Sequence, residues 1–302
     1  MNVLGRLHPS VAALALLLPT GCASAEAPGH DAATVVLSTT EEYRFGVEAE
    51  VHLPDPPPPG PVPVVVMVPG GSWERADRSR VASLAETLAG EGMVVVNASY
   101  RAARDDVVYP VPVQDVTCAA SWAVEYAAEQ GYAARSLVLV GHSAGAHLAA
   151  LASLGPDEFA DDCPAEPAAP TGLVGLAGPY DLSAVEGLAE SLVGAPRSQA
   201  AEVWTSADPM RRAGDRPEVD VLLLHGDADR TVSPAVSREF AVALRHGGHD
   251  VTLDVLPGVD HMGLVVAADV AATVIARWVG EHTAPRPSAS RSTVSADPPR
   301  GS

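Results

Sequence analysis

A serine stands at the centre of the pentapeptide Gly-His-Ser-Ala-Gly, residues 141–145. An unbroken apolar run, 137–140, precedes it and a run of strong helix formers follows, which is typical of a buried strand that turns sharply into a helix. Such a turn, here called the elbow, would hold the Ser143 hydroxyl clear of the strand and would need glycine on either side for steric reasons. The amide of Ala144 would begin the helix and face an oxyanion formed at the serine. The pattern predicts a nucleophilic serine.

A serine hydroxyl is a weak nucleophile at neutral pH, so it needs a base within hydrogen-bond reach and an acid to orient that base. Two later segments, 221–225 and 251–256, are predicted strands, and each is followed by a suitable side chain. Asp229 follows the first segment and His261 follows the second, while Asp227 is a rival for the acid. The chain order predicts a nucleophile, then an acid, then a base, all at strand ends.

Strands and helices alternate along the chain, which predicts an α/β fold with a mostly parallel central sheet and helices on both faces. Ligands of such folds bind at the carboxyl ends of the strands. Segment 178–217, after the strand that follows the elbow helix, is interrupted by glycine, proline and charge, so a small insert or lid is expected there. The other predicted strands are 62–68, 93–98 and 173–176, with one or two within 43–53, and the other predicted helices are 78–89, 113–130, 234–245 and 264–280.

Several separate motifs match a known pattern, and they are Pro69–Trp73, Tyr100, Arg101, Tyr109, Pro110, Asp115, 141–145, His147, His225, Gly226, Asp229, Val232 and His261. With these motifs the chain resembles the α/β-hydrolase superfamily, and within it the bacterial esterase and lipase branch with an H-G-G-x-W type of oxyanion loop. The likeness runs from about residue 62 to residue 280 and implies the α/β-hydrolase fold. The pairing of P-G-G-S-W with G-H-S-A-G-A-H is also similar to aryl formamidases.

The resemblance implies a role for each matching catalytic residue. Ser143 would be the nucleophile, His261 the general base and then acid, and Asp229 the carboxylate that holds the imidazole. Asp229 is preferred over Asp227 because the superfamily pattern places the acid three residues after the glycine of His-Gly.

The resemblance also implies an oxyanion hole made by the amides of Ala144, Gly71 and Ser72. One such donor is typically worth about 2.7 to 4 kcal/mol of transition-state stabilisation. Trp73 either lines the substrate pocket or only packs the loop. Pro69 stands where the branch has histidine, so at this position the chain lacks a side-chain donor that could brace the loop.

The remaining polar residues near these motifs are expected to support the fold. His142 should point into the fold, and His147 lies one helical turn after the serine. His225 should pack at the end of its strand, and Asp115 should cap a helix or brace a loop.

The leading hypothesis is a carboxylic-ester hydrolase that acts on a small-molecule ester through an acyl-enzyme. Two alternatives stay open. One is amide cleavage by the same machinery, as in aryl formamidases or peptidases, and the other is a surface lipoprotein that keeps the fold without turnover.

Composition excludes other classes. All 19 basic residues are arginine, so a Schiff-base lysine, a P-loop lysine and a Ser-Lys dyad are absent. No ligand-spaced His/Cys cluster occurs, so neither a metal nor a cofactor is expected. The formal net charge of -19 argues against nucleic acid or an anionic lipid surface as a partner.

The ends of the chain differ from its middle. Residues 1–21, with a charged start and a short apolar centre, predict a signal peptide for export, and 22–36 predict a tether. Cys22 is expected to be lipidated, giving a cell-envelope lipoprotein that touches the membrane only through this anchor, although Pro19 departs from the usual lipoprotein pattern; free secretion is the alternative. The hydrolase domain would span 37–282 and a disordered tail 283–302.

If Cys22 carries lipid, Cys118 and Cys163 remain as an even pair in an oxidising compartment. A disulfide between them is one hypothesis, and two buried free thiols are the other.

Overall fold

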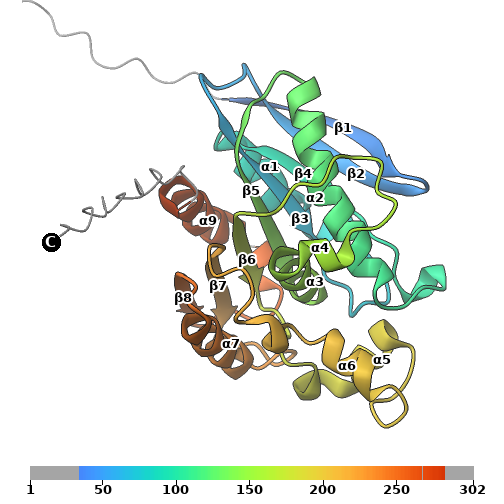
Figure 1. The fold of residues 1–302 in the computed structure, drawn as a ribbon. Coiled ribbons are helices and arrows are strands. Elements are labelled where there is room, and N and C mark those ends of the chain that lie inside the picture. Colours follow the sequence, from blue (N-terminus) through green and yellow to red (C-terminus); the bar gives the residue numbers. More distant parts are fainter. Residues whose placement is uncertain (1–33, 267, 283–302) are drawn as a thin grey trace, which may run out of the picture. The chain divides into compact units, whose positions relative to one another are not determined.

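The computed structural model describes residues 34–266 and 268–282 of the 302-residue chain (Figure 1). The predicted signal peptide, Cys22, most of the tether and the predicted tail lie outside these residues. Among the helices within them, none is both long and apolar enough to cross a bilayer.

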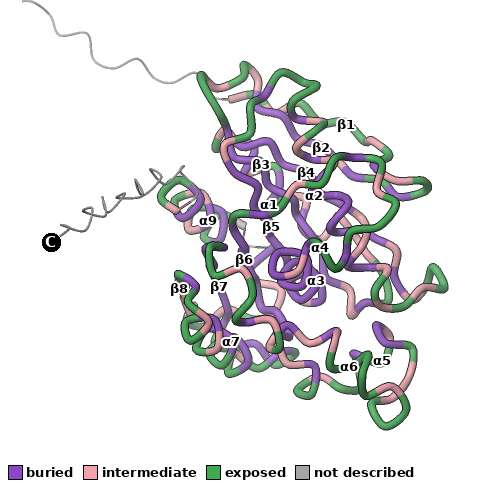
Figure 2. Tube along the Cα trace, in the orientation of Figure 1, coloured by how far each residue is buried: buried purple, intermediate pink, exposed green. Residues whose placement is uncertain are grey.

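In the described part of the chain, eight strands form one sheet. In sheet order they are β1 (Val35–Arg44), β2 (Val47–Asp55), β4 (Val94–Ala98), β3 (Val62–Val68), β5 (Ala134–His142), β6 (Gly172–Leu176), β7 (Asp220–Gly226) and β8 (Val251–Leu256). The β1–β2 and β2–β4 pairs are antiparallel and every other pair is parallel, which confirms the predicted mostly parallel sheet. Strands β3, β4, β6 and β7 are buried along their whole length, and Figure 2 shows this buried centre.

Helices cover both faces of the sheet, as predicted (Figure 1). One face carries α1 (Ala82–Gly90), α8 (Gly263–Val266) and α9 (Ala268–His282), and the other carries α2 (Val111–Glu129), α3 (Ala144–Leu154) and α7 (Pro234–Gly247). Alternate side chains of β3 enter the two cores because successive residues of a strand point to opposite faces. Val64 and Val66 join the core under α2 and α3, while Val65 and Met67 join the core under α1.

The expected insert lies between β6 and β7. It consists of the short helices η3 (Leu182–Val185), α5 (Glu186–Val193), α6 (Ala201–Ser206) and η4 (Pro209–Arg212). Leu182, Leu192 and Trp204 are buried in the core on the α3 side, and the Trp204 indole donates a 2.9 Å hydrogen bond to the carbonyl of Ala195. The insert is therefore packed against the rest of the fold.

Three of the sequence-based assignments differ from the structure in more than the last few residues of an element. β1 begins at Val35, inside the range assigned to the tether, because Val35 and Leu37 lie on the edge strand with exposed fractions of 58% and 52% and so show no buried alternation. The helix expected at 78–89 is a 3-10 turn, η1 (Arg78–Arg80), followed by α1. The helix expected at 264–280 is likewise divided into α8 and α9.

Candidate active site

The elbow joins β5 to α3 through Ser143, whose φ of +53° and ψ of -124° lie in a region that residues with a Cβ rarely adopt. The flanking glycines are required by close backbone contacts. A Cβ on Gly141 would lie 2.3 Å from the carbonyl oxygen of Gly145, and one on Gly145 would lie 2.2 Å from that of Val68. The Ser143 amide donates a 2.8 Å hydrogen bond to Leu176 of β6. The strained turn is thus held by the sheet on two sides.

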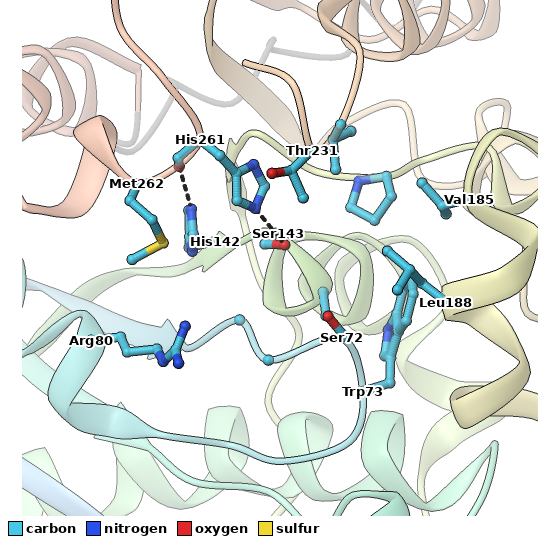
Figure 3. Close-up of a pocket in the computed structure, with 15 residues that line it drawn as sticks. Ser72, Trp73, Arg80, His142, Ser143, Val185, Leu188, Thr231, His261 and Met262 are labelled. Carbon is cyan, nitrogen blue, oxygen red and sulfur yellow. Dashed lines mark hydrogen bonds between the residues drawn. The ribbon is translucent and has the colours of Figure 1, made fainter.

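The three residues expected to react are connected by hydrogen bonds. The Ser143 hydroxyl donates to Nε2 of His261 at 2.9 Å, and Nδ1 of His261 donates to Oδ2 of Asp229 at 2.7 Å (Figure 3). Asp227 instead accepts a 2.6 Å hydrogen bond from the amide of Gly258. The structure therefore brings Asp229, and not Asp227, to the imidazole.

Asp229 is fixed by the loop that carries it. Its Oδ1 accepts hydrogen bonds from the amides of Thr231 at 2.8 Å and Val232 at 2.9 Å. Burial alone would raise the pKa of Asp229, but the Val232 amide, His261 and the Thr231 amide together lower it below its usual value. The carboxylate is thus charged when it faces the imidazole.

His225 supports the same carboxylate, which the sequence did not reveal. Its Nε2 donates to the carbonyl of Val232 at 3.0 Å and lies 3.2 Å from Oδ2 of Asp229, while Nδ1 accepts from Ser237 at 2.7 Å. Burial lowers the pKa of His225. A strand-end histidine that packs, as expected, therefore also orients the acid.

The loop after β3 brings Gly71 and Ser72 to the pocket that also contains Ser143 and Ala144. Gly71 has a φ of +153°, and a Cβ there would lie 2.1 Å from the carbonyl oxygen of Arg75, so only glycine fits. Ala144 is the first residue of α3, and amides in the first turn of a helix have no acceptor inside the helix. The three residues whose amides are predicted to form an oxyanion hole thus line one cavity.

Pro69 has no side-chain donor to brace the oxyanion loop. Tyr100 and His147 hold this loop instead. The Tyr100 hydroxyl donates a 3.0 Å hydrogen bond to the Pro69 carbonyl. The Trp73 indole donates to Nδ1 of His147 at 3.2 Å, and Nε2 of His147 donates to the carbonyl of Ala207 at 2.8 Å. Trp73 lines the pocket and also packs against His147. Both roles that the sequence allowed for Trp73, pocket lining and loop packing, therefore apply.

Both histidines near the serine are buried and neutral. Burial lowers the pKa of His142 and that of His147 to about 4. Nε2 of His142 donates a 2.9 Å hydrogen bond to the carbonyl oxygen of His261 (Figure 3). His142 therefore holds the backbone of the loop that carries the predicted base.

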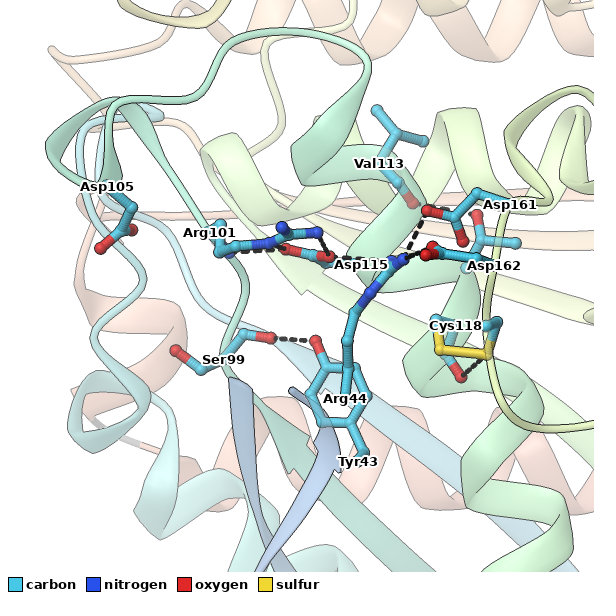
Figure 4. A network of polar contacts seen from close by, with 12 residues as sticks. Tyr43, Arg44, Ser99, Arg101, Asp105, Val113, Asp115, Cys118, Asp161 and Asp162 are labelled. Atoms are coloured by element: carbon cyan, nitrogen blue, oxygen red, sulfur yellow. Dashed lines mark hydrogen bonds and ion pairs between the residues drawn. A yellow bond between two sulfur atoms is a disulfide. The ribbon is translucent and has the colours of Figure 1, made fainter. Parts of the chain in front are cut away.

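Asp115 braces a loop beside the site (Figure 4). Its buried carboxylate accepts hydrogen bonds from the Arg101 amide at 2.9 Å and from the Arg101 guanidinium, and it also binds Arg44 at 3.0 Å. Because Arg101 follows Tyr100, this network fixes the segment whose tyrosine holds Pro69. Of the two roles expected for Asp115, the contacts match the loop brace.

A disulfide joins Cys118 of α2 to Cys163, in the loop before β6, with the two Cα atoms 5.4 Å apart (Figure 4). In the same loop, Asp161 binds the Arg44 guanidinium at 2.6 Å. The loop is thus attached to the fold by the disulfide and by ion pairs of Asp161 and Asp162 with Arg44.

The pocket around Ser143 has a volume of about 190 Å³. The insert contributes Pro179, Val185 and Leu188 to its wall, which agrees with the expectation that segment 178–217 borders the site. Its full lining is Gly70, Gly71, Ser72, Trp73, Arg80, His142, Ser143, Ala144, Pro179, Val185, Leu188, Thr231, Val232, His261 and Met262.

A mostly parallel sheet with a serine elbow after β5, an aspartate after β7 and a histidine after β8 defines an α/β-hydrolase fold. Solved esterase structures share this fold. Esterase 2 of Thermogutta terrifontis, bound to butyrate, superposes with a TM-score of 0.69 at 22% identity over 81% of this chain and 94% of that chain. A truncated carbohydrate esterase from gut microbiota gives a TM-score of 0.70 at 19% identity over 85% of this chain and 99% of that chain.

The structural matches show the fold, and the sequence comparisons identify the family. The family model described as BD-FAE matches residues 50–244, and the chain belongs to this family. Esterase LipQ of Mycobacterium tuberculosis is 32% identical over 241 residues, which cover 76% of this chain and 55% of LipQ. The chain thus spans about half the length of the curated relatives it matches. These matches confirm the predicted superfamily and agree with the predicted enzyme class, a carboxylic-ester hydrolase.

Proposed function

We propose that this protein is a serine esterase that cleaves small carboxylic esters, with Ser143 as nucleophile, His261 as base and acid, and Asp229 as the orienting carboxylate. The observation that carries the proposal is the continuous pair of hydrogen bonds from Ser143 through His261 to Asp229, at 2.9 and 2.7 Å. Nδ1 of His261 carries the proton that it donates to Asp229, so Nε2 is free to accept a proton.

In the proposed reaction, Ser143 Oγ bonds to the ester carbonyl carbon while its proton passes to Nε2 of His261. The carbonyl oxygen becomes an oxyanion, which the amides of Gly71, Ser72 and Ala144 stabilise. The carbon–oxygen bond to the alcohol then breaks, and Nε2 returns the proton to that alcohol. Water, deprotonated by His261, releases the acid from the acyl-enzyme by the same steps.

The pocket supports a short substrate. Its volume of about 190 Å³ is below the ~300 to 1,000 Å³ of sites that enclose drug-sized ligands. The solved esterase 2 structures include complexes with butyrate and with propionate, which are short acids. We therefore expect acyl groups of a few carbons to be preferred.

Labelling with a fluorophosphonate, followed by kinetics on a series of aryl esters and their matched anilides, tests the proposal. We expect covalent modification of Ser143, turnover of the short esters and much slower turnover of the anilides. Preference for an anilide would favour the amide-cleaving alternative, and no labelling with no turnover would favour the non-catalytic one.

We also propose that the protein is exported and anchored through Cys22. The support is the sequence alone, a charged start with an apolar run at 11–18 before this cysteine. Mass spectrometry of protein from its own host should find Cys22 as a lipid-modified first residue. A first residue beyond Cys22 without lipid would indicate free secretion.

A further inference from the structure

The pocket around Ser143 has one permanently charged residue in its lining, Arg80, within the part of the chain that the structure describes. Arg80 ends the 3-10 helix η1, just before α1. Figure 3 shows its guanidinium directed into the cavity from the side of His142 and Met262. This cation is not used in the proposed acyl-transfer steps, so its presence needs another explanation.

The contacts of Arg80 leave most of its donors available. Its Nε lies 3.4 Å from Oδ2 of Asp77, and both side chains are partly exposed, at 36% and 41%. The other carboxylate oxygen of Asp77 is engaged by the amide and hydroxyl of Ser79. Among the described residues, neither Nη group of Arg80 has an acceptor within hydrogen-bond distance. The two Nη groups form one edge of the planar guanidinium, and this edge can bind a carboxylate with two parallel hydrogen bonds.

The two sides of the pocket differ in chemistry. One side is apolar, made by Trp73, Val185 and Leu188, and Figure 3 shows it across Ser143 from Arg80. The Arg80 side carries a cation beside the buried, neutral ring of His142. An ester bound over Ser143 places its acyl half on one side and its alcohol half on the other, so the two halves meet opposite kinds of wall.

We propose that Arg80 binds a carboxylate of the substrate, so that the preferred esters carry an apolar group on one side of the scissile bond and an anionic group on the other. This inference rests on the proposed esterase function and names its substrate class. A chain with 38 acidic and 19 basic residues repels anions in general. Because this repulsion does not attract an anion from a distance, Arg80 would act only at short range, on the carboxylate of a substrate that is already in the pocket.

The test compares kcat/KM for matched ester pairs that differ only in charge. In one set the carboxylate is in the acyl half, as the mono-4-nitrophenyl esters of succinic, glutaric and adipic acid, each paired with its terminal amide. In the other set it is in the alcohol half, as the butyrate of 4-hydroxybenzoate paired with that of 4-hydroxybenzamide. Spontaneous hydrolysis is subtracted for each compound.

We expect the wild-type protein to favour the carboxylate over the amide by about tenfold in one of the two sets, as for a charge-assisted hydrogen bond at a partly exposed site. Raising the salt concentration should reduce this ratio. Arg80→Gln should bring the ratio to about one, and Arg80→Lys should keep part of it because the charge remains. Arg78→Gln is the matched control, since it removes the same charge from the same short helix, and should keep the wild-type ratio.

A wild-type ratio near one in both sets, or a ratio that Arg80→Gln leaves unchanged, would overturn the inference. These results differ from a failure of the esterase proposal, in which the neutral amide members would show no turnover and Ser143 would not be labelled. Because the readout is a ratio within one protein sample, a partial loss of folded protein in a variant does not change it.

Discussion

Replacing Asp229 by asparagine should reverse the proton arrangement of the imidazole. The amides of Thr231 and Val232 both donate to Oδ1 of Asp229, so in the variant the asparagine oxygen must take that position. The asparagine NH₂ group then faces Nδ1 of His261, where Oδ2 accepted a 2.7 Å hydrogen bond. A donor at this position requires Nδ1 to lose its proton, so the proton moves to Nε2. Nε2 can then no longer accept the proton of Ser143.

We expect Asp229→Asn to lower kcat on a short aryl ester by about 10⁴, the loss typical of a wrong imidazole tautomer. This corresponds to about 5 kcal/mol in the activation barrier. Asp227→Asn is the control, because Asp227 only accepts a hydrogen bond from the amide of Gly258 and an asparagine oxygen can do the same. It should stay within about threefold of the wild-type rate, since a surface substitution that keeps its hydrogen bond has a small effect.

The measurement is steady-state kinetics at neutral pH, with circular dichroism to confirm that both variants are folded. A folded Asp229→Asn variant within tenfold of the wild-type rate would refute the argument. An Asp227→Asn variant slower than Asp229→Asn would show that the acid is misassigned.

Three further predictions concern the other triad residues, the disulfide and the buried His147. Ser143→Ala and His261→Ala should each lower kcat by about 10⁶, because the residues of a triad act as one unit; near-native turnover in either would exclude the proposed mechanism. Reduction of the Cys118–Cys163 disulfide, which joins residues 45 positions apart, should lower the free energy of unfolding by up to about 4 kcal/mol. Initial rates at 25 °C should not change. Thermal melts with and without reductant measure the effect, and an equal Tm in both would contradict the prediction. The free energy of unfolding should fall as the pH falls from about 6.5 to about 4. Burial lowers the pKa of His147 in the folded protein to about 4, so the unfolded chain takes up a proton at this histidine at a higher pH than the folded protein does. Urea titrations should show a weaker pH dependence in His147→Gln.

The strands that precede Ser143 and Asp229, β5 and β7, could be predicted from sequence because they are buried along most or all of their length in a parallel sheet. Such strands appear as continuous apolar runs, and the bounds expected for β3 coincide with those observed, 62–68. The bounds expected for β8, 251–256, also coincide, although this edge strand is only half-buried and contains Thr252 and Asp254. The strand order also brings the segments after β5, β7 and β8 to one edge of the sheet. The pairing of His261 with Asp229 follows from that order and from the superfamily pattern.

The side chains that support the site could not be predicted, because their contacts join segments far apart in the chain. His142 holds a residue 119 positions away, and Trp73 and His147 are 74 positions apart. The sequence predicts a regular helix over 78–89, and nothing in that pattern marks Arg80 as part of a pocket. Only the fold determines which of these polar groups meet.

Three buried histidines, His142, His147 and His225, hold the groups of the proposed active site in place while His261 exchanges a proton. His142 holds the His261 backbone, His147 holds Trp73, and His225 lies against Asp229. Burial lowers the pKa of all three, so each stays neutral and keeps one donor and one acceptor nitrogen while His261 gains and loses a proton. A lysine or a protonated histidine at position 142 or 225 would add a positive charge beside the imidazole and oppose its protonation. Neutral rings at these two positions give fixed hydrogen bonds without that electrostatic cost, so burial of His142 and His225 favours the proposed proton transfer to His261.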